Sequence, residues 1–277
     1  MFKKSILETI KQRHSWRDYS DQTVEPEKIE MLKKAFNDLQ PPFGNKSFLD
    51  ILAIPADEIN KFTTYGFIKG AKMFIIGKTV KTPMCWEDYG WILEHIILLA
   101  TELGLCNCWL GGTFSRKNFE DKLDLAPDEI IPAIASIGYP TETRSLRDRA
   151  IRWVAGSHRR RPWNSLFFEQ DFNTPLPEDA GIYTSALAML RLAPSASNRQ
   201  PWRVIKKGDA FHFYLQRTPG YGSAFGVDLQ GIDMGIAMSH FELTLKEQGI
   251  TGKWQTENPN LPNLSLTPEY RVSWIKN

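Results

Sequence analysis

Three features that define large protein classes are scarce in this sequence: cysteine, long apolar runs and an excess of one charge. Three cysteines in 277 residues, at positions 85, 106 and 108, are too few and too clustered for a disulfide scaffold, which favours a reducing compartment. The most apolar run, Trp91 to Ala100, is too short to span a bilayer and carries Glu94 and His95. A formal net charge of +2 argues against a dedicated nucleic-acid-binding protein. The sequence therefore predicts a protein with neither a membrane nor a nucleic-acid partner.

Several motifs that would name a chemistry directly are also missing. No apolar signal core follows Met1 to Lys4, so we expect no export signal and a cytoplasmic location. No P-loop or G-x-S-x-G elbow occurs, and the glycines between 220 and 226 lack the G-x-G-x-x-G spacing. The histidines show neither H-x-x-x-H nor H-E-x-x-H spacing, and Cys106 and Cys108 form a C-x-C without a second pair. We therefore expect no metal site, and we expect buried thiols.

What is present is the composition of a soluble globular protein, with 42% hydrophobic and 24% charged residues. The chain is long enough to bury a sizeable core as one large domain or as two of ordinary size. Helical and strand-like spacing of apolar residues predicts the secondary structure. We expect helices over 5–13, 26–39, 90–103 and 182–192, and strands over 48–54, 71–77, 131–137 and 202–205.

The second half of the chain repeats the first. From Gly90 to Trp109, six residues are identical at an offset of 145: Gly90, His95, Leu98, Glu102, Gly104 and Trp109 match Gly235, His240, Leu243, Glu247, Gly249 and Trp254. At an offset of 153, Ala35, Leu39, Pro41 and Asn45 match Ala188, Leu192, Pro194 and Asn198. We interpret this pattern as an internal duplication whose two buried helices pack together, with His95 and His240 at the interface between the halves. Two separate domains are the alternative, but residues 165–180 contain no long flexible linker.

The stretch from Leu192 to Val204 links a predicted helix to a predicted strand and is rich in short polar side chains. Pro194 ends the helix, and Ser195, Ser197 and Asn198 favour an ordered turn. An ordinary turn and the edge of a site for a flat, hydrogen-bonding ligand both fit this pattern. The first-half counterpart, residues 41–48, lacks the serines and the Gln-Pro-Trp sequence.

Basic residues cluster at two places. Arg13, Ser15 and Arg17 alternate, so an extended segment would point all three to one side, as a phosphate site requires, although a solvated helix end fits too. The second half has no counterpart of this segment. Residues 158–161 form the other cluster, for which a solvated patch and a nucleic-acid contact are both open.

Two glycine-containing segments can bring backbone close to a ligand. Gly111 and Gly112 follow the first buried helix and offer bare N–H donors, although the segment taken by itself favours an ordinary turn. Residues 65–70 present backbone and the ammonium group of Lys69. Each half of the chain thus holds candidate site residues that the other half lacks, as expected for a pseudo-symmetric protein with one site.

Taken together, these motifs resemble the FMN-dependent nitroreductase family, in particular its internally duplicated branch. Residues 13–17 (RHSWR) resemble the family's R-[RH]-S-x-R phosphate motif, and residues 194–202 (PSASNRQPW) resemble its P-S-x-x-N-x-Q-P-W motif without a gap. Residues 103–112 resemble its G-L-G-x-x-W-x-G-G segment, and residues 137–140 and 159–162 resemble the strand end and basic tail that follow. The similarity runs from about residue 5 to residue 255.

The resemblance implies an α+β nitroreductase-like fold with two pseudo-symmetric halves, residues 1–165 on the phosphate side and residues 166–277 on the isoalloxazine side. Because neither motif has a second copy, it implies about one FMN per chain. It places the arginines at the phosphate, the Pro194 loop at the flavin edge, the paired glycines near N5 and Lys69 near the pyrimidine edge. The residues so assigned are Arg13, His14, Ser15, Arg17, Lys69, Gly111, Gly112, Arg159, Arg160, Pro194, Ser195, Ala196 and Asn198.

The implied activity is that of an NAD(P)H-dependent oxidoreductase. Hydride passes through flavin N5 to a nitroaromatic, a quinone or a similar flat acceptor, and no side chain serves as a catalytic group. The alternatives are an FMN-binding or storage protein with little turnover, and a reductive dehalogenase or flavin-modifying enzyme on the same fold. Because the chain contains both halves, we expect a monomer that acts as a pseudo-dimer, with further dimerisation open.

Overall fold

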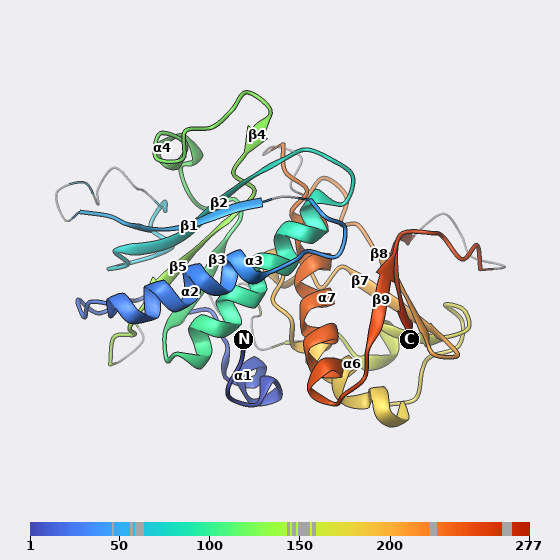
Figure 1. Ribbon diagram of the computed structural model, residues 1–277. Coiled ribbons are helices and arrows are strands. Elements are labelled where there is room, and N and C mark those ends of the chain that lie inside the picture. Colours follow the sequence, from blue (N-terminus) through green and yellow to red (C-terminus); the bar gives the residue numbers. More distant parts are fainter. Residues whose placement is uncertain are drawn as a thin grey trace.

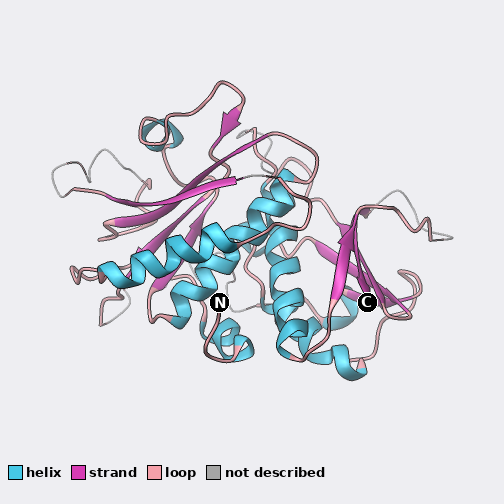
Figure 2. Ribbon diagram, viewed as in Figure 1, coloured by secondary structure: helices cyan, strands magenta, loops and turns pink. Residues whose placement is uncertain are grey.

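The computed structural model describes residues 1–45, 47–55, 58, 64–142, 145, 148, 156, 159–221, 226–261 and 268–277. Within these residues the chain forms two five-stranded sheets. The sheets lie on opposite sides of a central pair of helices, α3 (Cys85–Glu102) and α7 (Leu229–Glu247) (Figure 1). Figure 2 shows the resulting order of sheet, helices and sheet across the molecule.

The first sheet has the strand order β1-β2-β5-β3, and β4 pairs with β2 off this path. Its strands are β1 (Ser47–Ala53), β2 (Met73–Val80), β3 (Cys106–Leu110), β4 (Glu129–Ile130) and β5 (Ile134–Gly138). This half also contains the helices α1 (Ile6–Gln12), α2 (Pro26–Asp38) and α4 (Arg116–Glu120).

The second sheet has the order β6-β7-β8-β10-β9. Its strands are β6 (Phe167–Glu169), β7 (Trp202–Lys207), β8 (Ala210–Leu215), β9 (Gly252–Gln255) and β10 (Glu269–Lys276). Besides α7, this half contains α6 (Thr184–Leu192) and the short 3-10 turns η1 (Trp163–Ser165), η2 (Gly181–Tyr183) and η3 (Ala196–Asn198).

The two sheets share one topology, which supports the duplication that the sequence predicts. The strands β1, β2, β5 and β3 follow the same order as β7, β8, β10 and β9, and every one of these neighbouring pairs is antiparallel. The strand β6, which runs parallel to β7, and the short β4 are additions to this common plan. The division of the chain between residues 165 and 166 stays a prediction.

The predicted elements occur, with shifted ends that have physical causes. The buried helix expected from Gly90 begins at Cys85, directly after Met84, whose φ of 62° ends the preceding turn. The strand expected over residues 131–137 begins later, at Ile134 of β5, because Pro132 has no N–H to donate to a strand ladder. The short strand β4 ends at Ile130, before the predicted range.

The helices α3 and α7 cross so closely that their backbones touch. A Cβ added at Gly90 would lie 2.2 Å from the Ile232 carbonyl oxygen, and one added at Gly235 would lie 1.9 Å from the Glu87 carbonyl oxygen. Glycine allows this approach because it has no side chain. The two glycines are related by the offset of 145, so the same contact occurs twice across the interface.

Polar side chains cross the same interface in two related but unequal pairs. The His95 Nδ1 atom lies 3.0 Å from the Ser239 hydroxyl, and the His240 Nε2 atom lies 2.8 Å from a Glu94 carboxylate oxygen. Both histidines are buried, which confirms their predicted place between the halves. The offset of 145 relates Glu94 to Ser239, so the duplicated position carries an acid in one half and a hydroxyl in the other.

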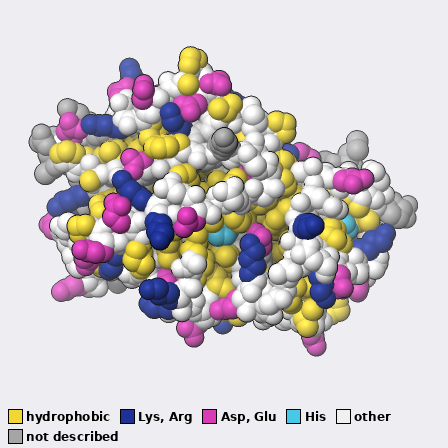
Figure 3. All heavy atoms as spheres, in the orientation of Figure 1, with side chains coloured by type: hydrophobic (Ala, Val, Ile, Leu, Met, Phe, Trp, Pro, Cys, Tyr) yellow, Lys and Arg dark blue, Asp and Glu magenta, His cyan; other side chains and the backbone are white. Residues whose placement is uncertain are grey.

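The surface in Figure 3 carries Lys and Arg side chains interspersed with Asp and Glu side chains over both halves. No helix among the described residues combines the length and the apolar character needed to cross a bilayer.

Candidate functional site

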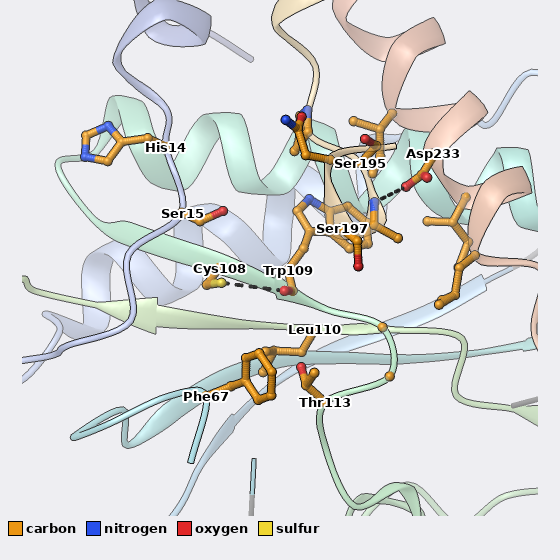
Figure 4. Close-up of a pocket in the computed structure, with 18 of the residues that line it drawn as sticks. His14, Ser15, Phe67, Cys108, Trp109, Leu110, Thr113, Ser195, Ser197 and Asp233 are labelled. Atoms are coloured by element: carbon orange, nitrogen blue, oxygen red, sulfur yellow. Dashed lines mark hydrogen bonds between the residues drawn. The ribbon is translucent and has the colours of Figure 1, made fainter. Parts of the chain in front are cut away.

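A cavity of about 450 Å³ lies where the two halves meet, within the size range of small-molecule sites. Figure 4 shows that its walls come from segments far apart in the sequence. The first half contributes Arg13, His14, Ser15, Arg17, Phe67, Cys108, Trp109, Leu110, Gly111, Gly112, Thr113 and Arg160, and the second contributes Pro194, Ser195, Ala196, Ser197, Asn198, Tyr221, Leu229, Ile232, Asp233 and Ile236.

The segment after α1 is held extended along the first sheet. The helix ends at Gln12, and the next residue, Arg13, has extended φ and ψ values of −64° and 122°. The Trp16 N–H then donates to the Asn107 carbonyl oxygen on β3, and the Lys69 N–H donates to the Arg17 carbonyl oxygen. Extended backbone alternates its side chains between two sides. Arg13, Ser15 and Arg17 accordingly line the same cavity.

The guanidinium of Arg13 is buried at the cavity wall, with 7% of the residue exposed. Its Nε lies 3.9 Å from a Glu94 carboxylate oxygen. Neither Nε nor Nη1 makes a hydrogen bond within the described part of the chain. Burial lowers the pKa of Arg13, and the negative charge of Glu94 acts against that shift. A buried cation with unused donors is costly unless a ligand pairs with it, so this geometry fits an anion.

Glu94 links the arginine to both halves. One carboxylate oxygen contacts His240 at 2.8 Å, and the other accepts a 2.7 Å hydrogen bond from the Trp109 indole. The position of the carboxylate is therefore fixed by α7 and β3 together. We interpret Glu94 as a residue that orients Arg13.

Two further arginines lie at this cationic end of the cavity. Burial, followed by the nearby charges of Arg13 and Arg191, lowers the pKa of Arg160 to about 10. Arg17 pairs with Asp148 at 3.1 Å. Like charges gathered in a buried place repel one another, and a bound anion relieves that repulsion.

The loop between α6 and β7 adopts backbone conformations that are unusual for its residues. Ser197, Asn198 and Gln200 have φ values of 48°, 55° and 50°. Residues other than glycine rarely adopt such values, and they persist where the surrounding structure enforces them. The Ser195 hydroxyl accepts from the Gln200 N–H at 2.9 Å, and the Tyr221 hydroxyl donates to Ser197 at 2.9 Å. This loop is a constrained wall of the cavity.

The side chains of this loop hold the basic segment of the other half. The Asn198 amide nitrogen donates to the carbonyl oxygens of Gly156 (2.7 Å) and Arg159 (2.9 Å), and its oxygen accepts from Arg160 at 3.2 Å. Gln200 accepts from the Arg161 N–H at 2.8 Å. Asn198 lines the cavity, but its amide is directed to Gly156, Arg159 and Arg160, so it positions Arg160.

Other predicted residues lie in different places. Lys69 and Arg159 are exposed and are not among the residues that line the cavity. The ring of His14 points away from Ser195 and Asp233, whereas the Ser15 hydroxyl points toward the middle of the cavity (Figure 4). His158, part of the predicted basic cluster, lies outside the described residues.

The middle of the cavity is narrow and partly apolar. A Cβ at Gly111 would lie 2.7 Å from Leu229 Cδ2 on the other half, so glycine permits close approach here. Phe67, Leu110 and Ile236 add apolar surface. A cationic end beside an apolar middle suits a flat molecule that carries an anionic group.

Sequence reasoning missed several lining residues, above all Asp233 and Tyr221. Asp233 lies inside an apolar helix, and the repeat contained a signal for it, because Asp88 stands at the same offset of 145. Tyr221 lies in a loop without a motif. Among the described residues, no group of three or more His, Cys, Asp or Glu side chains is arranged to hold a metal ion.

Comparison with known proteins gives consistent matches. A family model described as "Putative TM nitroreductase" matches residues 5–245. A protein of Archaeoglobus fulgidus named "Putative NADH dehydrogenase/NAD(P)H nitroreductase" is 27% identical over 58% of this chain and 99% of its own length. A Methanothermobacter thermautotrophicus protein of the same name is 28% identical over 53% and 83%. The crystal structure of a Thermotoga maritima nitroreductase, itself described as putative, shares the fold, with a TM-score of 0.61, 22% identity and coverage of 99% and 95%.

Proposed function

Because the chain belongs to the family described as "Putative TM nitroreductase", and is thus an enzyme of an oxidoreductase family, we propose that it is an FMN-dependent NAD(P)H oxidoreductase. Its acceptors would be nitroaromatics, quinones or similar flat molecules. The names of the two curated relatives support the choice of NAD(P)H. The observation that carries the proposal is the buried Arg13, with unused donors, in a cavity shared by both halves.

The residues that line the cavity fit FMN. Arg13, Ser15, Arg17 and Arg160 would hold the phosphate, because guanidinium groups and hydroxyls give it charge-assisted hydrogen bonds. The loop from Pro194 to Asn198, with Gly111 and Gly112 opposite, would enclose the flat ring. When bound, FMN supplies the hydride transfer between NAD(P)H and the acceptor. The protein contributes binding, orientation and exclusion of water.

The same geometry supports one FMN per chain. In the first half, the loop equivalent to Pro194–Asn198 is bonded to Asp88, whose two oxygens accept from the N–H groups of Phe43 (3.0 Å) and Asn45 (2.9 Å). The arginine motif also has no second copy. We further infer that the chain acts as a monomer in which the two halves replace the two subunits of a dimer.

The test is an absorbance spectrum of the purified protein, followed by acid release and quantification of the flavin. We expect about one FMN per chain, and oxidation of NADH or NADPH when menadione or nitrofurazone is added. A bound flavin without turnover would favour an FMN-storage protein. Absence of flavin after incubation with FMN would refute the proposal, and two FMN per chain would refute the single site.

The substitution Asn198→Ala tests whether the second half positions the arginine of the first. Because the amide bonds to Gly156, Arg159 and Arg160, its loss should leave Arg160 with fewer anchors and weaken FMN binding about tenfold. Fluorescence titration of FMN into the apoprotein measures this effect. Ser165→Ala, which removes a hydroxyl bonded only within its own turn, is the control and should leave the affinity unchanged. Equal affinities of the Asn198→Ala variant and the wild type would contradict the shared site.

A further inference from the structure

Asp233, on the second turn of α7, brings a carboxyl group to the cavity wall (Figure 4). The residue is 2% exposed. Its Oδ1 accepts a 2.9 Å hydrogen bond from the Ala196 N–H of the strained loop. Its Oδ2 has no hydrogen-bond partner among the described residues. Buried polar atoms are rarely left unpaired, so this oxygen needs an explanation.

Asp88, the counterpart of Asp233 at the offset of 145, shows which hydrogen bonds the same carboxyl makes away from the cavity. Asp88 accepts from the Phe43 N–H with Oδ1, as Asp233 does from Ala196, and Phe43 and Ala196 are related by the offset of 153. The second oxygen of Asp88 accepts from the backbone N–H and the side-chain amide of Asn45. Asn198, the counterpart of Asn45, instead turns its amide to Gly156 and Arg159.

One half of the chain therefore uses both oxygens of this carboxyl to close a loop, and the other half leaves one oxygen unused at a cavity. We propose that Asp233 is a ligand-binding residue whose Oδ2 forms a hydrogen bond with a polar atom of the flat molecule bound there. The inference rests on the proposed function, because it takes that molecule to be the flavin ring or the flat acceptor.

The surroundings of Asp233 determine whether its Oδ2 atom or the bound molecule donates the proposed hydrogen bond. Burial raises the pKa of Asp233 well above its ordinary value; the Ala196 N–H lowers it in part, and the nearby Asp228 raises it further. The charge of Asp228 is itself paired with Arg217, at 2.9 Å. Burial and, to a smaller extent, Asp233 raise the pKa of Tyr221, a second titratable group at this wall of the cavity. Burial thus favours the neutral form of the carboxyl, in which Oδ2 donates its proton to a carbonyl, nitro or ring-nitrogen acceptor of the bound molecule. Enzymes use buried neutral carboxyls as donors in this way.

The test compares Asp233→Asn with Asp233→Leu. Asparagine keeps an acceptor for Ala196 and replaces the Oδ2 proton with an N–H donor, so it should preserve binding within about twofold. Leucine removes the donor and should weaken binding about fivefold to tenfold. Titration of FMN into the apoprotein shows a flavin contact, and the KM for menadione at saturating FMN shows an acceptor contact. If the Leu variant changes neither quantity, the proposal is wrong.

A second measurement separates a contact with the ligand from support of the loop. The infrared difference spectrum between FMN-bound and FMN-free protein, and then between menadione-bound and menadione-free protein, should contain a shifted carboxylic-acid C=O band. This band should disappear in Asp233→Asn. A band that ligands leave unchanged would mean that Asp233 only supports Ala196. Failure of the wild type to bind FMN would refute the proposed function, whereas a wild type that binds FMN without any response of Asp233 would refute this inference alone.

Asp88→Asn is the matched control. Every donor around Asp88 is an N–H group, so an amide there would place its own N–H against that of Asn45. We expect its Tm to fall by about 2–8 °C, whereas the Tm of Asp233→Asn should stay within about 1 °C of the wild type. Equal losses of Tm in the two variants would show that Asp233 is a second loop-closing carboxylate, which contradicts the proposal.

Discussion

Arg13→Ala should lower the affinity for FMN by about tenfold to a hundredfold, because a charge-assisted hydrogen bond contributes about 1.5–3 kcal/mol. The variant should leave the FMN-free protein no less stable. Arg13 is a buried cation with two nitrogens that make no hydrogen bond among the described residues, and its removal relieves that cost. Glu94 keeps its contacts with His240 and Trp109.

The effects of Arg13→Ala on FMN affinity and on the stability of the apoprotein are measured separately. Fluorescence titration gives the FMN affinity, and thermal unfolding of the apoprotein gives its Tm. Arg159→Ala is the control, since Arg159 is exposed outside the cavity and its loss should change neither quantity. A Tm of the Arg13→Ala apoprotein well below that of the wild type would show that Arg13 is a structural residue, and an unchanged affinity would remove it from the site.

Gly235→Ala should lower the free energy of unfolding by about 3 kcal/mol or more. In an exposed helix this substitution stabilises by about 1 kcal/mol, because alanine is the better helix former. Here the new Cβ would lie 1.9 Å from the Glu87 carbonyl oxygen and 2.8 Å from the Trp91 nitrogen, both backbone atoms of α3. Backbone cannot rotate aside as a side chain does, so the helices must separate.

Urea denaturation of the wild type and the variant measures this loss. Gly231→Ala is the control in the same helix, because the three atoms nearest to its Cβ would be side-chain atoms of Trp86 and Asp228, the closest being Trp86 Cβ at 2.9 Å. We expect a smaller loss there. Since the cavity lies between the halves, Gly235→Ala should also weaken FMN binding. A variant as stable as the wild type would mean that the interface between α3 and α7 tolerates separation.

Local sequence patterns predicted most of the fold. Apolar spacing placed the buried helices, and the repeat placed His95 and His240 between them, because a duplicated helix that is apolar all round must pack against its copy. Element ends were less predictable. Pro132 delays the start of the strand expected over 131–137 to Ile134. Met84, whose φ is 62°, sets the start of α3, and composition does not predict such a backbone angle.

Residues of the candidate site could be predicted where they belong to a sequence motif. They could not be predicted where only tertiary packing brings them to the cavity. Arg13, Ser15 and Pro194 came from recognisable patterns, and all three line the cavity. Asp233 did not, because an acid within an apolar helix has no motif, and its free oxygen depends on which way Asn198 turns. Lys69 is the opposite case, a residue that was predicted for the site but does not line the cavity. Its backbone N–H donates to the Arg17 carbonyl oxygen, whereas the residue itself is exposed.

The unequal pairs at the interface of the halves bear on why the two copies share one chain. In a dimer of identical subunits, every residue of the interface occurs twice, once in each subunit. A glutamate that suits one of the two related sites must therefore also be accommodated at the second site. Here Glu94 contacts His240 near Arg13, while its related position carries Ser239 beside His95. When both copies lie in one chain, each copy can change its sequence independently. One of the two related contacts between α3 and α7 can then carry a carboxylate beside a cation, while the other carries a neutral hydroxyl.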